Sequence, residues 1–222
     1  MYNAKENPLF SDTHLSHHLD EAKFAYLCKI ISEADEVIIN GYFWDYYLTD
    51  WENFLQSPWK ILFPLLKSKN AIYIFGNHDL KEFSDERVNL FSVAQTQQYT
   101  LKASDRIFNI QHGHKIAPGI EQKYPMLNHR RFISTSLKIN NFIGSFLGGD
   151  LDKAFHKKVN ERMKKYAADT LLENEVLICG HSHLVELNEP APFINSGMIR
   201  LGIAQSLIIN GDKIELVNAR YK

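Results

Sequence analysis

The chain of 222 residues is 45% hydrophobic and carries a formal charge of -1 at neutral pH. This length and hydrophobic content predict one globular domain over residues 1–222, with room for a modest insertion. The near-neutral charge gives no general reason to bind nucleic acid or an anionic membrane. Without an apolar leader or a run of about 18 apolar residues, we expect a cytoplasmic protein with no transmembrane segment. The two cysteines lack a CxxC spacing and are expected to be buried structural thiols.

Strands and helices alternate through the first eighty residues or so. The residue patterns predict strands over residues 8–10, 37–40 and 71–75, and helices over residues 21–34 and 51–67. Asp20 is expected to cap the first helix, and Pro58 and Pro64 are expected to break the second. This alternation predicts a mainly parallel sheet with right-handed crossovers.

The second half of the chain has a different organisation. Residues 98–101 and 106–110 predict one hairpin, residues 175–179 predict a strand, and residues 205–209 and 213–217 predict a hairpin around Asn210-Gly211. Between them, residues 118–172 predict a helical insertion with helices at about 130–147 and 151–172. Residues 121–170 contain ten Lys or Arg against five Asp or Glu. This local excess of positive charge indicates an anionic ligand.

Side chains that commonly bind metals follow the predicted strands at their carboxyl ends. The carboxyl ends of neighbouring parallel strands lie about 4.8 Å apart, so these side chains can converge if the strands belong to one sheet, as we expect. Imidazole, carboxylate and amide groups together favour manganese, iron or zinc over calcium. Any single pair could be an ordinary loop feature, but the ordered set predicts a metal site. Its members are Asp12, His14, Asn77, His112, His181 and His183.

The motifs at residues 12–14, 41–45, 76–79, 112–113 and 180–183 resemble those of the calcineurin-like metallophosphoesterases. The resemblance implies an α/β fold, a four-layered α/β/β/α sandwich with a dinuclear metal site. In it, Asp12, His14 and His183 would hold one metal, and Asn77, His112 and His181 would hold the other. The helical insertion over residues 118–172 is similar to the cap of the UDP-2,3-diacylglucosamine pyrophosphatases. That similarity implies a nucleotide-sugar lipid or a nucleotide as substrate.

Position 42 departs from the pattern of this superfamily. The resemblance implies an aspartate there that bridges both metals, whereas this chain has Tyr42. Because a bridging carboxylate offsets the repulsion between two dications, a neutral phenol should weaken at least one site. A metal could instead lower the pKa of the phenol until it binds as phenolate. We therefore expect two sites from the resemblance, with one of them weak or empty.

The remaining polar residues of these motifs have roles that the resemblance implies. His78 would protonate the leaving oxygen, and Asp45 and Asp79 would orient ligating imidazoles. His114 is expected to be a substrate-side group or a spare ligand. Cations of the insertion suit a phosphate or diphosphate, although a solvated helix face explains such charges as well. Those assigned to substrate binding are His129, Arg130, Arg131, Lys157 and Lys158.

Together these features predict a metal-dependent hydrolase of phosphoester or pyrophosphate bonds, weakened by Tyr42. Manganese is the expected metal, with iron, zinc and magnesium as alternatives. The expected partner is a phosphorylated small molecule or lipid, and a lipid substrate would bring the protein into peripheral contact with a membrane. The alternative is a binding protein of the same fold whose catalysis is impaired. Restoring aspartate at position 42 distinguishes the two.

Overall fold

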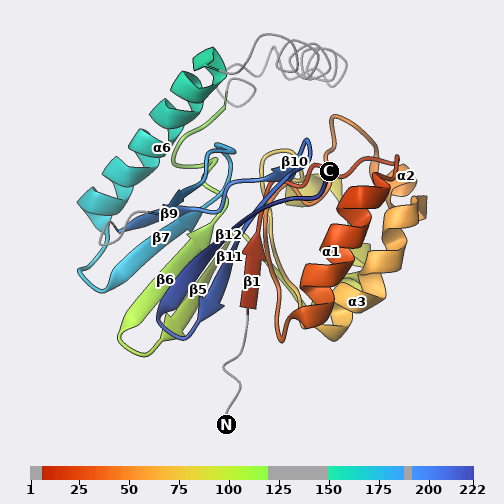
Figure 1. The fold of residues 1–222 in the computed structure, drawn as a ribbon, viewed down its shortest axis with the longest axis horizontal. Helices are drawn as coiled ribbons and strands as arrows, with labels where there is room; N and C mark the ends of the chain where they lie inside the picture. The colour runs from red at the N-terminus through yellow and green to blue at the C-terminus, as the bar shows by residue number, and fades with distance from the viewer. Residues whose placement is uncertain (1–6, 120–149, 188–191) are drawn as a thin grey trace.

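Two β-sheets lie between helices in the computed structural model, which describes residues 7–119, 150–187 and 192–222 (Figure 1). Helices α1 (Glu21–Glu33) and α3 (Leu62–Ser68) lie on one outer side, and α6 (Asp150–Thr170) lies on the other. This order of layers confirms the predicted α/β/β/α sandwich. Helix α6 matches the second helix predicted for the insertion, whereas the first, at about residues 130–147, lies outside the described residues.

The first sheet brings three loops to one edge. Its strand order is β10-β11-β1-β2-β3-β4, with β12 paired to β11. Strands β1 to β4 are parallel, so the loops after β1, β2 and β3 leave from the same edge. Strand β11 runs antiparallel to β1. The strands are β1 (Asn7–Phe10), β2 (Ile38–Asn40), β3 (Ile72–Ile74), β4 (Ala94–Thr96), β10 (Ile199–Arg200), β11 (Ile203–Asn210) and β12 (Lys213–Arg220).

The second sheet has the order β5-β6-β7-β9-β8, with β6, β7 and β9 parallel. Its strands are β5 (Gln98–Ala103), β6 (Arg106–Gln111), β7 (Glu175–Cys179), β8 (Glu186–Leu187) and β9 (Phe193–Asn195). The predicted metal ligands therefore follow strands of two sheets, and the expectation of a single sheet was wrong. Residue periodicity identifies a strand but does not say which sheet the strand joins.

Proline acts differently at the two predicted helix breaks. Pro58 separates α2 (Trp51–Gln56) from the 3-10 helix Pro58–Ile61, as predicted. Pro64 does not interrupt α3, because it lies in the first turn of that helix, where N–H groups have no partner within the helix. Asp20 caps α1 as expected, since its side chain accepts a 3.2 Å hydrogen bond from the backbone N–H of Lys23.

Three apolar clusters hold the layers together. Between the two sheets, Leu9, Ile74 and Leu207 pack with Phe108 and Ile178. An aromatic-rich cluster joins the first sheet to its helices, and a third cluster joins α6 to β7 and β9. Burying each large apolar side chain stabilises the fold by about 1.5–3 kcal/mol. These contacts fix the two sheets relative to each other, and with them the loops at their edges.

Two smaller predictions can be compared with the structure. Both cysteines are free, but only Cys179 is buried, whereas Cys28 is partly exposed. The loop of the final hairpin consists of Gly211 and Asp212, because Asn210 pairs with Lys213. The predicted loop was therefore one residue too early.

No described helix has the length and apolar character needed to cross a membrane.

Candidate metal centre

The loops after β1 and β2 are joined to each other by backbone hydrogen bonds. The N–H groups of Asp12, His14 and Leu15 donate to the carbonyls of Gly41, Tyr42 and Phe43, at 3.1, 2.8 and 3.0 Å. These bonds continue the pairing of β1 with β2 beyond the ends of the strands. The side chains on the two loops are therefore held in a fixed register.

The backbone is strained at the residues that carry the site. Eight described non-glycine residues have a positive φ; five belong to the site, Asp12 (57°), His14 (47°), His181 (68°), His183 (58°) and Tyr42 (54°), and three, Asn70, Ser104 and Leu201, do not. This left-handed conformation is unfavourable for most residues and persists only where the surroundings impose it. Such strain is typical of functional loops, and here it coincides with four predicted metal ligands and the substituted position.

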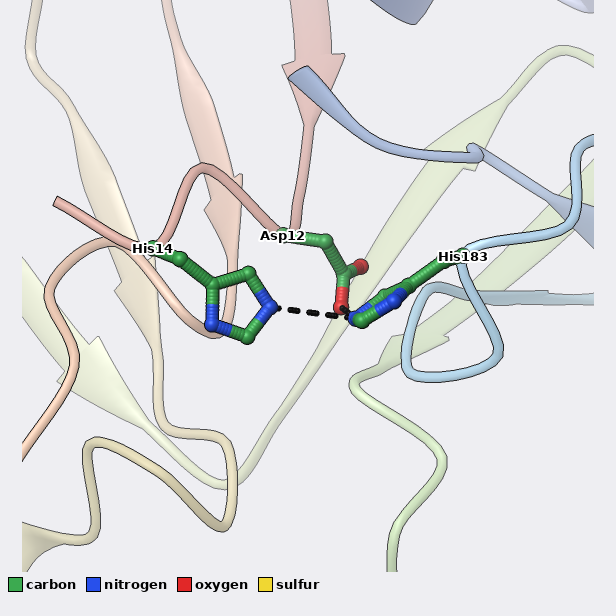
Figure 2. Close-up of side chains that lie close together, drawn as sticks. All are labelled: Asp12, His14 and His183. Atoms are coloured by element: carbon green, nitrogen blue, oxygen red, sulfur yellow. Dashed lines mark hydrogen bonds and ion pairs between the residues drawn. The ribbon is translucent and has the colours of Figure 1, made fainter. Parts of the chain in front are cut away.

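Three of the predicted ligands converge on one point (Figure 2). Nε2 of His14 lies 3.0 Å from Nε2 of His183, which in turn lies 3.1 Å from Oδ1 of Asp12. Two donors that lie about 2.1 Å from a cation at right angles to each other are separated by about 3.0 Å. These two separations fit donors that share a divalent metal, and all three atoms lie within 4.8 Å of one another. Asp12 and His14 are buried, and His183 is partly exposed, which leaves one side of the cluster accessible.

Hydrogen bonding puts the His14 ring in the form that binds a metal. Its Nδ1 lies 2.7 Å from Oδ2 of Asp45, a buried carboxylate. A proton on Nδ1 donates to that carboxylate, so Nε2 keeps its lone pair toward Asp12 and His183. The same carboxylate oxygen lies 3.0 Å from Nδ1 of His78. These two hydrogen bonds explain why the Asp45 carboxylate lies close to both His14 and His78.

The electrostatics favour the same protonation states. Burial tends to raise the pKa of Asp12, but the neighbouring His183 and two further histidines bring it below its ordinary value. Burial, together with the charge of Arg200, lowers the pKa of His14 well below its ordinary value of 6.5. An ionised carboxylate and a neutral imidazole are the forms that bind metals. Near neutral pH both groups are therefore ready to act as ligands.

The other three predicted ligands surround Tyr42. Nδ1 of His112 lies 2.8 Å from the Asn40 carbonyl, and Nε2 of His181 lies 2.8 Å from the Ala117 carbonyl. Each ring therefore keeps a lone pair on its other nitrogen. Between them, the Tyr42 hydroxyl donates a 2.7 Å hydrogen bond to Oδ1 of Asn77 and lies 3.3 Å from Nδ1 of His181. The phenol thus contacts two of the three side chains expected to bind the second metal.

Asp79 occupies a position different from the one expected for a group that orients imidazoles. Its carboxylate accepts hydrogen bonds from the N–H groups of Phe43 and Gly76, at 2.9 and 2.7 Å, and from the Tyr73 hydroxyl, at 2.7 Å. These bonds join the loops after β2 and β3. Burial raises the pKa of Asp79 to about 6. Asp79 therefore organises the backbone of the site, whereas Asp45 contacts the imidazoles.

The residues assigned to substrate binding lie in different places. His114 is buried, with its ring 5.7 Å from that of His112, and burial together with the nearby His181 lowers its pKa to about 3. Lys157 and Lys158 are exposed on α6. Residues 129–131, which are His129, Arg130 and Arg131, lie outside the described residues.

Three residues near the site were missed in the sequence. The His156 ring, on α6, lies 5.7 Å from the His183 ring, and the charge of Arg200, on β10, acts on Asp12 and Asp45. Asn160 on α6 accepts hydrogen bonds from Ser182 and Asn195, at 2.6 and 3.1 Å, and so holds the loop that carries the last two histidines. The sequence predicted that cations of α6 bind substrate, but no local sequence motif distinguishes His156, Asn160 or Arg200.

Comparison with solved structures shows which fold this is. The chain is similar to Vps29 from Entamoeba histolytica, solved in complex with zinc, with 13% identity, a TM-score of 0.50 and coverage of 98% of this chain and 99% of that one. It is also similar to YfcE, a phosphoesterase from E. coli, with 16% identity, a TM-score of 0.49 and coverage of 97% and 100%. No sequence-family profile matches the chain, and no curated protein matches it by sequence.

The two-sheet α/β sandwich of this chain is the fold of the similar Vps29 structure, and it is also the fold that the resemblance noted in the sequence implies. This confirms the resemblance noted in the sequence at the level of the fold. At identities this low, the similar structures establish the architecture alone, and what the site does is argued from its own residues.

Proposed function

We propose that this chain hydrolyses phosphoester or diphosphate bonds with a divalent metal held by Asp12, His14 and His183. The observation that carries the proposal is the convergence of three donor atoms at about metal-ligand spacing, in the protonation states that bind metals. Zinc in the similar Vps29 structure supports a divalent ion in this fold. Manganese, iron or magnesium would suit the same donors, and we favour manganese.

A bound divalent ion would supply Lewis acidity, which activates water and neutralises the phosphoryl oxygens. The protein residues around the ion would position and protonate the reacting groups. Asp45 holds His14 in its ligating form and also contacts Nδ1 of His78 at 3.0 Å. With Nδ1 directed at Asp45, His78 can hold a proton at Nε2 and deliver it to the leaving oxygen. Arg200 adds positive charge close to Asp12 and Asp45, which favours an anionic substrate.

The proposed substrate is a phosphorylated small molecule of the nucleotide or nucleotide-sugar class. Helix α6 supports this assignment, because it brings His156 near His183 and presents Lys157 and Lys158 to solvent. A lipid-bearing substrate, with peripheral membrane contact, rests on the sequence resemblance of residues 118–172 alone. A cytoplasmic location is part of the same proposal and agrees with the two free cysteines.

The proposal is tested by hydrolysis assays on protein purified without chelator, with manganese or zinc added. Aryl phosphate monoesters, aryl phosphate diesters and a UDP-sugar distinguish the bond types. His183→Ala should abolish turnover, whereas His18→Ala, a histidine change on the exposed part of the loop after β1, should leave it unchanged. Absence of turnover with every substrate and metal, or equal turnover in His183→Ala, would contradict the proposal.

The second candidate is a phosphate-binding protein with impaired catalysis, favoured by the burial of Tyr42 among the predicted ligands. Such a protein would bind inorganic phosphate or a UDP-sugar in a metal-dependent manner and release it unchanged. Comparing wild type with Tyr42→Asp separates the two candidates. Turnover by the wild type supports the enzyme, whereas turnover that appears only in the variant supports the binding protein.

A further inference from the structure

Tyr42 fills the space between the two halves of the predicted dinuclear site. The residue is 3% exposed, and its ring lies 4.6, 4.2 and 4.1 Å from the rings of His14, His78 and His112, measured between centroids. Rings at these separations are in packing contact. The centre of the histidine cluster is therefore occupied by carbon atoms of the phenol.

The neighbouring backbone accommodates this ring. Gly76 faces it directly, since a Cβ built at that position would lie 2.7 Å from Cδ1 of Tyr42. The main chain of Tyr42 has the same left-handed conformation as four predicted ligands, with φ of 54°. From this backbone conformation the side chain of Tyr42 extends into the centre of the site.

Two of the three donors expected at the second site contact the phenol hydroxyl. Asn77 accepts its hydrogen bond at 2.7 Å, and Nδ1 of His181 lies 3.3 Å from the same oxygen. Nε2 of His112 is buried, but among the described residues no group forms a hydrogen bond with it. A phenol is longer than a carboxylate, so its oxygen projects past the point where a bridging carboxylate would end. The three donors therefore do not fit a second cation while Tyr42 stands between them.

We propose that Tyr42 takes the place of the second cation, so that this centre binds one divalent ion, at Asp12, His14 and His183. The phenol satisfies Asn77 and contacts His181 in place of a dication. With a single cation, no bridging carboxylate is needed to offset repulsion between two metals. This inference rests on the proposed function, because it concerns the same site and the same ion.

Metal counting tests the proposal without relying on activity. Wild type, Tyr42→Phe, Tyr42→Asp and His183→Ala are dialysed against zinc or manganese, and the bound metal is measured by elemental analysis. We expect one ion per chain in the wild type and in Tyr42→Phe, two in Tyr42→Asp and none in His183→Ala. Aspartate tolerates the left-handed backbone better than tyrosine, so Tyr42→Asp should fold, which circular dichroism checks.

Each other outcome overturns the inference in a distinguishable way. Two ions in the wild type, falling to one in Tyr42→Phe with loss of phenolate absorption in the ultraviolet, would make Tyr42 a ligand of a second metal. That result would leave the proposed function standing. One ion in Tyr42→Asp would show that Tyr42 is not what closes the second site, and retention of the ion in His183→Ala would place it elsewhere. No ion in the wild type would overturn this inference and the proposed function together.

Discussion

Nδ1 of His14 lies 2.7 Å from Oδ2 of Asp45, and both residues are buried. The nearby His78 and His14 bring the pKa of Asp45 below its ordinary value, although burial tends to raise it. The Asp45 carboxylate is therefore ionised and accepts a hydrogen bond from Nδ1–H of His14. This bond leaves the lone pair on Nε2 of His14 directed toward Asp12 and His183. Asp45 touches no expected metal position itself, but it fixes how His14 presents its lone pair.

Asp45→Asn should weaken metal binding by about 10- to 100-fold, because the neutral amide no longer fixes the tautomer and orientation of His14. Calorimetric titration with zinc measures the affinity of the wild type and the variant. Asp50→Asn is the matched control, since the Asp50 side chain caps α2 by accepting from the Asn53 N–H and asparagine caps a helix equally well. Equal affinities for wild type and Asp45→Asn would argue against this role.

His78→Gln should lower kcat by about 100- to 10,000-fold, because glutamine cannot deliver the proton to the leaving oxygen. Its metal content should remain that of the wild type, since Nδ1 of His78 bonds to Asp45, which is not itself a predicted ligand. Steady-state kinetics and elemental analysis on the same preparation measure both quantities. If the metal were lost together with the activity, His78 would have to be assigned to metal binding instead.

Gly180→Ala should disturb Asp12 directly. A Cβ at position 180 would lie 2.4 Å from Oδ2 of Asp12 and 2.4 Å from Oγ of Ser11. We expect destabilisation of about 1–3 kcal/mol from overpacking, together with weaker metal binding because Asp12 must move. Urea unfolding and zinc titration measure the two effects.

Gly211→Ala is the control for Gly180→Ala. It lies in the final hairpin loop, where nothing is within 4 Å of the added carbon, although its φ of 60° makes the change mildly strained. It should cost about 1 kcal/mol in stability and leave metal affinity unchanged. An equal loss of affinity in the two variants would show that the effect is a general consequence of lower stability.

Lys23 should make stability depend on pH in the alkaline range. Its Nζ donates a 2.8 Å hydrogen bond to the Thr13 carbonyl, and burial together with Arg200 lowers its pKa from 10.5 to about 8. Between these pH values the unfolded chain binds a proton that the folded chain does not. The free energy of unfolding therefore rises with pH from about 8 to 10.5, by at most about 1.4 kcal/mol per pH unit.

The variant Lys23→Met isolates this contribution. Urea unfolding of both proteins across that pH range gives the difference between wild type and variant, in which other titrating groups cancel. The difference should increase with pH in favour of the wild type and be constant below about pH 8. If the difference in unfolding free energy between the two proteins stayed constant across this pH range, the Lys23 ammonium would not be buried in the way that the structure indicates.

The sequence predicted most strands and three side chains that lie together in the structure, Asp12, His14 and His183, because those features are local. Asp12 and His14 follow a short apolar strand directly, and the His-x-His motif follows β7, so strand ends and residue chemistry were sufficient. Strand β4 was missed, because Ala94–Thr96 is only half-buried and lacks an apolar run. The division into two sheets could not be read from periodicity.

The less predictable features depend on contacts between distant segments. Lys23 lies on the same face of α1 as the buried Leu27 and Ile31, but its charge alone would place it in solvent, whereas in the structure its Nζ donates to the Thr13 carbonyl. The position of the Tyr42 ring depends on Gly76 and on three histidines from other loops. Sequence showed that the bridging aspartate is replaced, but only the structure shows the phenol between Asn77 and His181.

Anomalous diffraction from crystals grown with manganese would test the central claim most directly. A single strong peak should lie between Oδ1 of Asp12, Nε2 of His14 and Nε2 of His183, with the Tyr42 hydroxyl still bonded to Asn77. No peak among those three donors, or a second peak coordinated by the Tyr42 oxygen, would contradict a centre with one metal ion.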